Sequence, residues 1–384
     1  MVVHIWLRVS NRGKRNMRNS PTVSNGVKRK LKIAIFCTNE WPTPPPQNTF
    51  YAPLWMAFYI AEGLAKRGHK VFYFGSRESK LKYAKLVSFG MPAIKYNKKL
   101  SPFIPQINEK VANFYEQLMV SKIYQMDKKE KFDIIHIHPY RRCINFAPLT
   151  KTPTVITIHD PINGFIKHML SWTKNIPQIF LVSLSNAQRK PLLKLNYIAT
   201  VYNGIDLKKF KFNEKPKDYF VAAGRFVPEK GIDLAILAAK KAKIKLRIAG
   251  GPAKGIFWEK KIKPYLDKNI KYVGMIDYLK MSDFYRKAKG LLYPHRWQEP
   301  FGLIFVESMA CGTPPIAFDR GSAKEIIKDG KTGFIVKNFD EMVRAIKRID
   351  EIHRENCRSW VEEKFSVSRM VDDYEKVYHK ILSR

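Results

Sequence analysis

Short apolar runs and longer amphipathic stretches alternate along this chain, and the alternation limits its fold more than any other feature. Ile33–Phe36 is a short apolar run typical of a strand, Leu54–Arg67 has helical periodicity and is followed by Gly68, and Val71–Phe74 is the next apolar run. Further strands are expected at Ile134–His138 and Thr154–Ile158. Strand, helix and strand in this order predict an open parallel α/β sheet covered by helices.

The same alternation begins again after Asp218. Since 384 residues exceed what one hydrophobic core usually serves, two domains are expected. The turn Asn203-Gly204 and the charged residues after it suit a linker between them. The second series comprises strands at Tyr219–Ala223, Lys245–Ala249, Ile270–Val273 and Gly290–Tyr293, and helices at Ile232–Ala242 and Leu303–Ala310.

Four segments follow from this pattern. Residues 1–30 are polar and basic with little periodicity, and we expect a disordered tail there. Residues 31–204 are expected to form the first Rossmann-like domain, residues 205–366 the second, and residues 367–384 an amphipathic helix that returns to the first domain.

The formal net charge of +37 raises the question of an anionic partner. Residues 1–32 carry nine Lys or Arg and no acid, but the remaining excess is spread along the chain, and no zinc finger or RNA-binding signature focuses it on a groove. A lysine-rich background and an anionic membrane surface stay open as explanations. No run reaches the roughly 20 apolar residues of a spanning helix, so we expect a cytoplasmic protein. Peripheral contact at the inner face of the membrane belongs to the second of these two explanations.

The four cysteines, Cys37, Cys143, Cys311 and Cys357, lie far apart and form no CxxC pair. Their spacing predicts buried, reduced thiols, with neither disulfides nor a zinc site.

The strongest motif is a pair of carboxylates, Glu299 and Glu307, separated by seven residues. Pro300 and Gly302 indicate a helix start after a strand and loop, which places Glu299 at the start of the helix and Glu307 about two turns inside it. The free N–H groups of such a start favour an anion. For an isolated pair, acids that merely complement the helix dipole would be the simpler explanation.

The surrounding residues resemble a known family. The segment EPFGLIFVESMACGTPPIAFDRGSAKEIIKDGKTGF is similar to the E-x7-E signature block of glycosyltransferase family 4. The resemblance extends to Gly224-Arg225, to Glu229-Lys230-Gly231 and to Ile248–Pro252, covers most of residues 200–384, and covers residues 31–199 more loosely. It implies the GT-B fold, in which two Rossmann-like domains with parallel sheets face each other across a cleft.

The resemblance also assigns roles in binding a nucleotide-sugar donor. It implies that Arg225 and Lys230 bind the diphosphate, that Glu299 contacts the transferred sugar, and that Glu307 accepts hydrogen bonds from the ribose. It further implies backbone contacts and residues bordering the nucleobase. These positions are Phe301, Gly302, Leu303, Gly250, Gly251, Val273, Gly274 and Met275.

In the first domain, His159 follows an expected strand, at the edge where open α/β sheets bind ligands. It matches a family histidine near the reacting sugar. The resemblance therefore implies four catalytic residues, His159, Glu299, Arg225 and Lys230, and we expect His159 to act as a hydrogen-bond donor. His136 and His138 alternate within a strand and are expected to be satisfied core or edge residues. One departure is the proline-rich loop Trp41–Phe50, which replaces the family's usual Gly-Gly loop and leaves its role on the acceptor side open.

These observations predict a retaining hexosyltransferase. A UDP- or GDP-linked sugar would be the donor and a glycan or lipid-linked hydroxyl the acceptor, in cell-surface glycan or glycolipid synthesis. Neither a cofactor nor a metal is expected, because no DxD triad appears, and no nucleic-acid partner is expected. The alternatives are a GT-B epimerase or phosphorylase, or a basic RNA- or membrane-binding protein on a GT-B scaffold.

Overall fold

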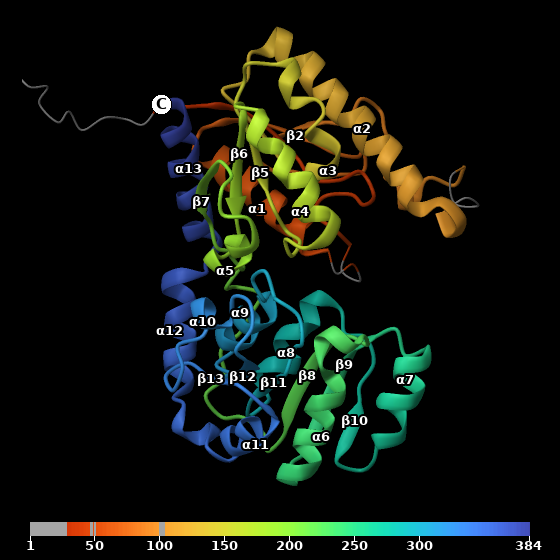
Figure 1. Cartoon of the computed structure of the whole chain (residues 1–384), viewed down its shortest axis with the longest axis vertical. Helices are drawn as coiled ribbons and strands as arrows, with labels where there is room; N and C mark the ends of the chain where they lie inside the picture. Colours follow the sequence, from red (N-terminus) through yellow and green to blue (C-terminus); the bar gives the residue numbers. More distant parts are fainter. Residues whose placement is uncertain (1–28, 47–48, 50, 100–103) are drawn as a thin grey trace, which may run out of the picture. The chain divides into compact units, whose positions relative to one another are not determined.

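The computed structural model describes residues 29–46, 49, 51–99 and 104–384. The tail expected at residues 1–30 therefore lies almost entirely outside the described residues, as do Gln47, Asn48 and Phe50 of the proline-rich loop. Residues Leu31–Arg384 form one compact unit, whose helices and strands are labelled in Figure 1.

The first sheet has seven strands in the order β3-β2-β1-β4-β5-β6-β7, and all its neighbouring strands are parallel. Chain order reverses between β1 and β4, so the loops after these two strands diverge and leave a crevice at the carboxyl edge. The strands are β1 Lys32–Phe36, β2 Lys70–Phe74, β3 Lys85–Val87, β4 Ile134–Ile137, β5 Thr154–Thr157, β6 Ile179–Ser183 and β7 Tyr197–Thr200. The helices are α1 Ala52–Lys66, α2 Ile104–Glu130, α3 Tyr140–Cys143, α4 Gly164–Ser171 and α5 Asn186–Arg189.

The second sheet has six parallel strands in the order β10-β9-β8-β11-β12-β13. Its order reverses between β8 and β11, so the loops that carry Lys230 and Glu299 flank the same crevice. The strands are β8 Phe220–Arg225, β9 Leu246–Gly251, β10 Ile270–Tyr272, β11 Leu291–Tyr293, β12 Pro315–Phe318 and β13 Phe334–Val336. The helices are α6 Ile232–Ala242, α7 Ile256–Lys261, α8 Met281–Arg286, α9 Leu303–Ala310, α10 Ala323–Ile326, α11 Phe339–Lys347 and α12 Arg354–Lys364.

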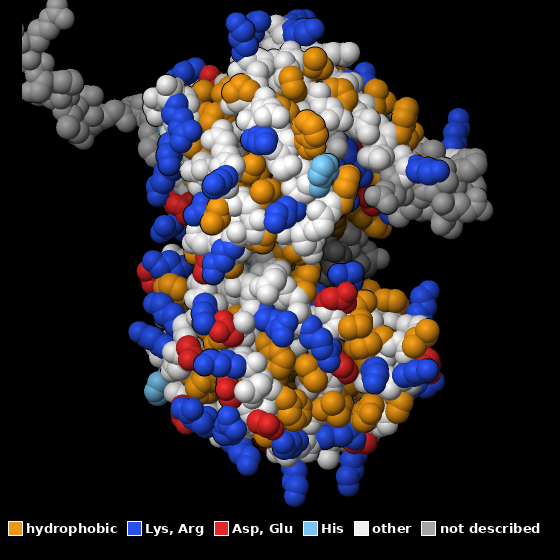
Figure 2. Space-filling model, viewed as in Figure 1, with side chains coloured by type: hydrophobic (Ala, Val, Ile, Leu, Met, Phe, Trp, Pro, Cys, Tyr) orange, Lys and Arg blue, Asp and Glu red, His pale blue; other side chains and the backbone are white. Residues whose placement is uncertain are grey.

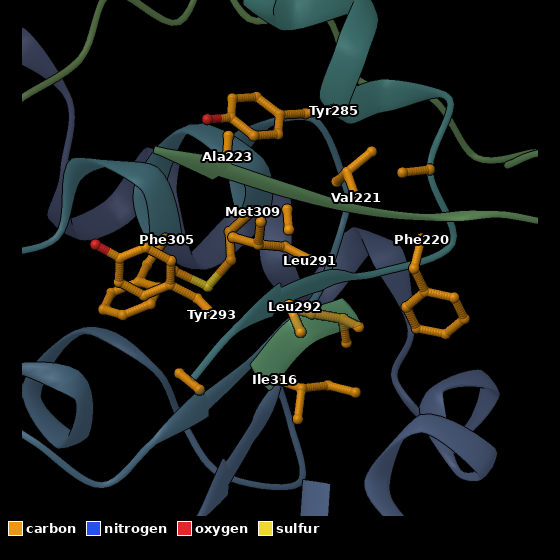
Figure 3. Close-up of a cluster of buried hydrophobic side chains, with 14 of the residues drawn as sticks. Phe220, Val221, Ala223, Tyr285, Leu291, Leu292, Tyr293, Phe305, Met309 and Ile316 are labelled. Carbon is orange, nitrogen blue, oxygen red and sulfur yellow. The ribbon is translucent and has the colours of Figure 1, made fainter. Parts of the chain in front are cut away.

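The core of the second domain fixes α9 against its sheet. Figure 3 shows Leu291 and Tyr293 of β11 on the side of the sheet that carries Phe305 and Met309 of α9, and all four side chains are buried. The ring of Tyr293 meets that of Phe305 edge to face, with 5.3 Å between centroids. Burial of several large side chains on α9, each worth roughly 1.5–3 kcal/mol, holds the helix that carries Glu307 in a fixed register.

The last helix, α13 (Val367–Leu382), packs against α1 and β7 of the first domain. Its amino terminus is capped by Ser366, whose Oγ accepts from the Arg369 N–H. Just before α13, Ile205 and Ser366 form an isolated parallel bridge, so the two chain segments that connect the sheets lie side by side. Gly204 permits this approach, because a Cβ there would lie 2.5 Å from the Ser366 carbonyl oxygen. We propose 31–204, 205–366 and 367–384 as the segment limits.

Several expectations about composition are tested by the fold. All four cysteines are buried free thiols, as expected. Across the described residues, no helix combines the length and apolar character needed to cross a membrane. Figure 2 shows Lys and Arg scattered over the visible face with apolar side chains between them, which agrees with a charge excess that is spread along the sequence.

Candidate active site

The carboxylate of Glu299 is held by three donors in the loop between β11 and α9. Its Oε2 accepts from the Tyr293 hydroxyl at 2.8 Å, from the Trp297 indole N–H at 2.9 Å and from the Lys230 ammonium at 3.1 Å, and the residue is 8% exposed. Two of these donors were not foreseen from the sequence. Because all three meet Oε2, the other oxygen has no donor among the described residues and is available to a ligand hydroxyl.

Lys230 is the cation of this cluster. Its Nζ also donates to the Tyr293 hydroxyl at 2.8 Å and lies 4.1 Å from the centroid of the Trp297 ring. Burial lowers the pKa of Lys230, while Glu299 acts against that shift. The next residue, Gly231, has φ +69°, and a Cβ there would collide with the Pro294 carbonyl. Glycine is therefore needed for the loop to bring Lys230 to Glu299.

Arg225 ends β8 and is exposed, one residue after Gly224. Gly224 pairs with Gly250 of the neighbouring strand β9. Gly250 has φ +136°, and a Cβ there would collide with the Gly224 carbonyl oxygen. The glycine-framed spacing read from the sequence thus has a steric cause, and it leaves bare backbone beside the arginine.

Glu307 lies on α9 beneath the same crevice and is 9% exposed. Burial raises the pKa of Glu307 to about 8, and the Tyr285 hydroxyl, which donates to Oε2 at 3.3 Å, opposes this shift only in part. Burial therefore favours the neutral form of this carboxyl group.

Arg225, Lys230 and Glu307 line one cavity of about 410 Å³. Of the residues predicted from the sequence, seven line it, namely Arg225, Lys230, Gly250, Gly251, Met275, Leu303 and Glu307. The other predicted residues, Glu299, His159, Val273, Gly274, Phe301 and Gly302, are not among its walls. Glu299 nevertheless contacts the wall residue Lys230, and Gly302, with φ +82°, precedes the first turn of α9.

His159 follows β5 in the first domain, as expected. Its Nε2 lies 2.7 Å from Nδ1 of His138. His136 is a satisfied core residue, hydrogen-bonded to Tyr378 and Thr157. His138 is buried, but its Nε2 has no hydrogen-bond partner within the described part of the chain. We expected both ring nitrogens of His138 to be hydrogen-bonded, and only Nδ1 is.

The cavity also has aromatic walls that sequence reasoning missed. Trp55 from α1 stacks on Tyr278, with 5.3 Å between ring centroids, and both line the cavity. The Nζ of Lys209 lies 4.0 Å from the Trp55 ring centroid and 3.1 Å from the Tyr59 hydroxyl. In sequence, Trp55 and Tyr59 have the i, i+4 spacing of an ordinary core face, and nothing in that pattern indicates a cavity wall.

The proline-rich loop is tied down at Thr43. Its N–H donates to Ser79 Oγ at 2.9 Å, its hydroxyl lies 2.9 Å from the Tyr73 hydroxyl, and its carbonyl accepts from Lys80. The nearby residues Thr49 and Tyr51 line the cavity. No three His, Cys, Asp or Glu side chains among the residues described are grouped as a metal site would require.

The comparisons with known proteins identify the class. Residues 205–365 match the family described as "Glycosyl transferases group 1", and residues 55–209 match "Glycosyltransferase Family 4". The chain belongs to glycosyltransferase family 4, and it is a glycosyltransferase of the GT-B fold.

Two curated relatives show how far the sequence similarity extends. An uncharacterized 41.2 kDa protein in the cps region of Klebsiella pneumoniae is 29% identical in an alignment that covers 65% of this chain and 80% of that protein. The N-acetyl-alpha-D-glucosaminyl L-malate synthase of Bacillus anthracis is 25% identical in an alignment that covers 92% of this chain and 98% of that protein.

Solved structures confirm the fold. The sucrose-phosphate synthase of Thermosynechococcus elongatus matches with a TM-score of 0.68 at 19% identity, over 92% of this chain and 100% of that one. HepE of Anabaena, solved in complex with UDP-glucose, matches with a TM-score of 0.63 at 15% identity, over 92% of this chain and 100% of that one.

Proposed function

We propose that this glycosyltransferase moves a hexose-type sugar from a UDP- or GDP-linked donor to an acceptor hydroxyl, with retention of configuration. The observation that carries the proposal is the cavity in which Arg225, Lys230 and Glu307 meet, with Glu299 bound to Lys230. Two cations in the lining of one cavity suit a diphosphate, and a buried carboxyl group in the same lining suits the paired hydroxyls of a ribose. HepE, which shares the fold, was solved with UDP-glucose.

In this proposal the donor diphosphate binds Arg225, Lys230 and the first turn of α9. The free N–H groups and the partial positive charge of the helix start add to the two cations. Gly250 and Gly251 allow close approach to the backbone, and Val273, Gly274 and Met275 border the nucleobase. Met275 is 64% exposed, so it is free to pack on a base. Phe301, Gly302 and Leu303 contact sugar and phosphate through their backbone.

The reaction breaks the bond between the anomeric carbon and the phosphate oxygen, and the nucleoside diphosphate leaves with the bonding electrons. The acceptor oxygen attacks from the same face, and its proton passes to the departing phosphate. Positive charge develops on the sugar ring and negative charge on the leaving group. Lys230 and Arg225 stabilise the latter, and their effect grows as the bond breaks. Glu299 and His159 orient the sugar.

The acceptor is proposed to be a hydroxyl of a glycan or lipid-linked molecule used in cell-surface synthesis. Because a relative that spans nearly the whole chain is named N-acetyl-alpha-D-glucosaminyl L-malate synthase, N-acetylglucosamine donors and L-malate belong in the first acceptor screen.

A contact with an anionic membrane is proposed at a basic stretch beside β3. Lys80, Lys82 and Lys85 are exposed there, and Tyr83 and Phe89 are 47% and 44% exposed. Cations next to exposed aromatic rings suit the interface of a bilayer. The proposed contact is with the cytoplasmic, inner face of the membrane. Pelleting with anionic but not neutral liposomes at low salt is expected, and equal pelleting with both would refute the contact.

A donor screen tests the main proposal. The protein is mixed with UDP- and GDP-sugars, donor binding and slow hydrolysis are measured, and the products formed with an acceptor are examined by NMR. The expected product is an α-linked glycoside from an α-linked donor. Free nucleotide with an epimerised sugar, or sugar phosphate formed from inorganic phosphate, would assign a different activity to the same fold.

A further inference from the structure

Three histidine rings lie in a row at the carboxyl edge of the first sheet. His136 belongs to β4, His138 follows that strand on the same face, and His159 follows the neighbouring strand β5. The ring centroids of His136 and His138 are 4.5 Å apart, and those of His138 and His159 are 5.0 Å apart. The row therefore runs from the buried interior to the residue that we expect beside the sugar.

The inner end of the row is fixed by α13. Nδ1 of His136 lies 2.7 Å from the Tyr378 hydroxyl, and its Nε2 lies 2.8 Å from Thr157 Oγ1. Thr157 Oγ1 in turn lies 2.8 Å from the Tyr374 hydroxyl. With both nitrogens bonded and no exposed surface, His136 provides a rigid plane on which His138 stacks.

Burial favours the neutral form of all three rings. Burial lowers the pKa of His136 to about 3 and that of His159 to about 4, and it lowers the pKa of His138 well below its usual value. Two neutral imidazoles in contact share a single hydrogen-bonding proton. The 2.7 Å contact between His138 Nδ1 and His159 Nε2 thus has two arrangements, which differ in which ring is the donor.

The surroundings favour one arrangement. If His159 were the donor, the proton of His138 would sit on Nε2, which is buried and has no partner among the described residues. A buried N–H without an acceptor is costly and rare in proteins. If His138 is the donor, its proton is used in the contact, and His159 carries its own proton on Nδ1. His159 is only partly buried, and its Nδ1 is not among the buried atoms without a partner in the described residues, so a ligand or water can accept from that N–H.

We propose that His138 is a positioning residue: its Nδ1–H donates to Nε2 of His159 and so fixes His159 as the tautomer that presents an Nδ1–H donor to the transferred sugar. This inference rests on the proposed function, since it assumes that His159 faces the sugar. It gives a role to His138, which the sequence alone assigned to the core or to the sheet edge.

The experiment compares two substitutions of the same residue. In His138→Asn the amide nitrogen occupies about the place of Nδ1 and keeps a donor, whereas His138→Leu removes it. We expect His138→Leu to lower kcat about tenfold or more, with little change in the KM of the donor. This is the effect on the rate of losing one hydrogen bond to the transition state. His138→Asn should recover most of the loss. His168→Leu, at an exposed histidine of the same domain, is the matched control and should match the wild type.

A second readout does not depend on turnover. Nitrogen-15 NMR of histidine-labelled protein reports which ring nitrogen of His159 carries the proton. The wild type and His138→Asn should show the Nδ1–H form, and His138→Leu should shift toward the Nε2–H form. An Nε2–H form of His159 in the wild type would overturn the inference, as would a folded His138→Leu protein with normal kcat. If His138→Leu fails to fold, the wild-type spectrum decides. If the wild type turned over no nucleotide sugar, the proposed function would fail separately from the tautomer assignment.

Discussion

The ammonium of Lys230 and the carboxylate of Glu299 form an ion pair, with 3.1 Å between Nζ and Oε2 and both side chains largely buried. The hydroxyl of Tyr293 joins them, since it accepts from Lys230 and donates to Glu299. The two residues lie 69 positions apart in sequence, and the pair fixes the cation before any ligand arrives. A preorganised charge of this kind stabilises a developing anion without rearrangement.

Lys230→Ala is therefore expected to lower kcat by roughly two orders of magnitude or more, the scale of losing one preorganised stabiliser of transition-state charge. Glu299 keeps its contacts with Tyr293 and Trp297, so the fold should persist. Steady-state kinetics with a thermal melt would measure both. Lys240→Ala removes an exposed ion pair with Asp267 and serves as the control. Near-normal turnover by a folded Lys230→Ala protein would contradict the role in diphosphate binding.

Trp297→Phe separates two contacts of one side chain. The phenyl ring keeps an aromatic face for Lys230, but the N–H that donates to Glu299 is lost. Because Glu299 is proposed to orient the sugar, we expect kcat to fall and discrimination between donor sugars to weaken together. Glu299→Gln should change the same two quantities more strongly. Competition assays with two nucleotide sugars measure the selectivity. Unchanged selectivity in both variants would remove Glu299 from the sugar contact.

Glu307→Gln tests the ribose contact. The proposed hydrogen bonds are equal in the ground state and in the transition state, so their loss should chiefly raise the KM of the donor and leave kcat nearly unchanged. A donor with 2′-deoxyribose should lose affinity for the wild type and show little further loss with the variant. Equal losses for both proteins would show that Glu307 does not contact the ribose.

The same substitution should change stability with pH. Burial raises the pKa of Glu307 to about 8 from an ordinary value of 4.5, so between these values the folded state binds more protons than the unfolded state, and stability falls as pH rises. Glu307→Gln removes this contribution. Its Tm relative to the wild type should therefore increase from pH 5 to pH 9, by roughly 2 °C or more. A Tm difference that stays constant over this range would contradict the raised pKa.

Turnover is expected to survive EDTA. Arg225 and Lys230 both line the cavity and supply the positive charge for the departing diphosphate, and the sequence has no DxD triad. Activity assays with EDTA, and then with added magnesium or manganese, test this expectation. Loss of activity on chelation, followed by recovery with either metal, would assign the diphosphate to a metal ion instead of the two side chains.

The local pattern of the sequence was sufficient for part of the helices and strands. Helices at Ile232–Ala242 and Leu303–Ala310 have the expected bounds, and the last helix begins at Val367 as expected, because apolar periodicity and flanking glycines act within a few residues of each other. The repeated strand–helix order also indicated two parallel sheets, which the structure confirms. The E-x7-E segment and its glycines also pointed to the family. Close approaches of the backbone require glycine at particular positions, and these positions can be recognised in the sequence.

Contacts between distant segments were decided only by the tertiary structure. Three sets of contacts depend on how strands and loops meet in space. They are the donation from Trp297 and Tyr293 to Glu299, the cavity wall of Trp55 and Tyr278, and the hydrogen bond between His138 and His159. In the sequence, an aromatic or histidine residue that packs in a core cannot be told from one that contacts a catalytic residue. The sequence alone determined the fold class and the main charges of the site, because these follow from short-range order. The pKa of Glu307 and the pairing of Lys230 follow from burial and long-range contacts, which exist only once the chain has folded.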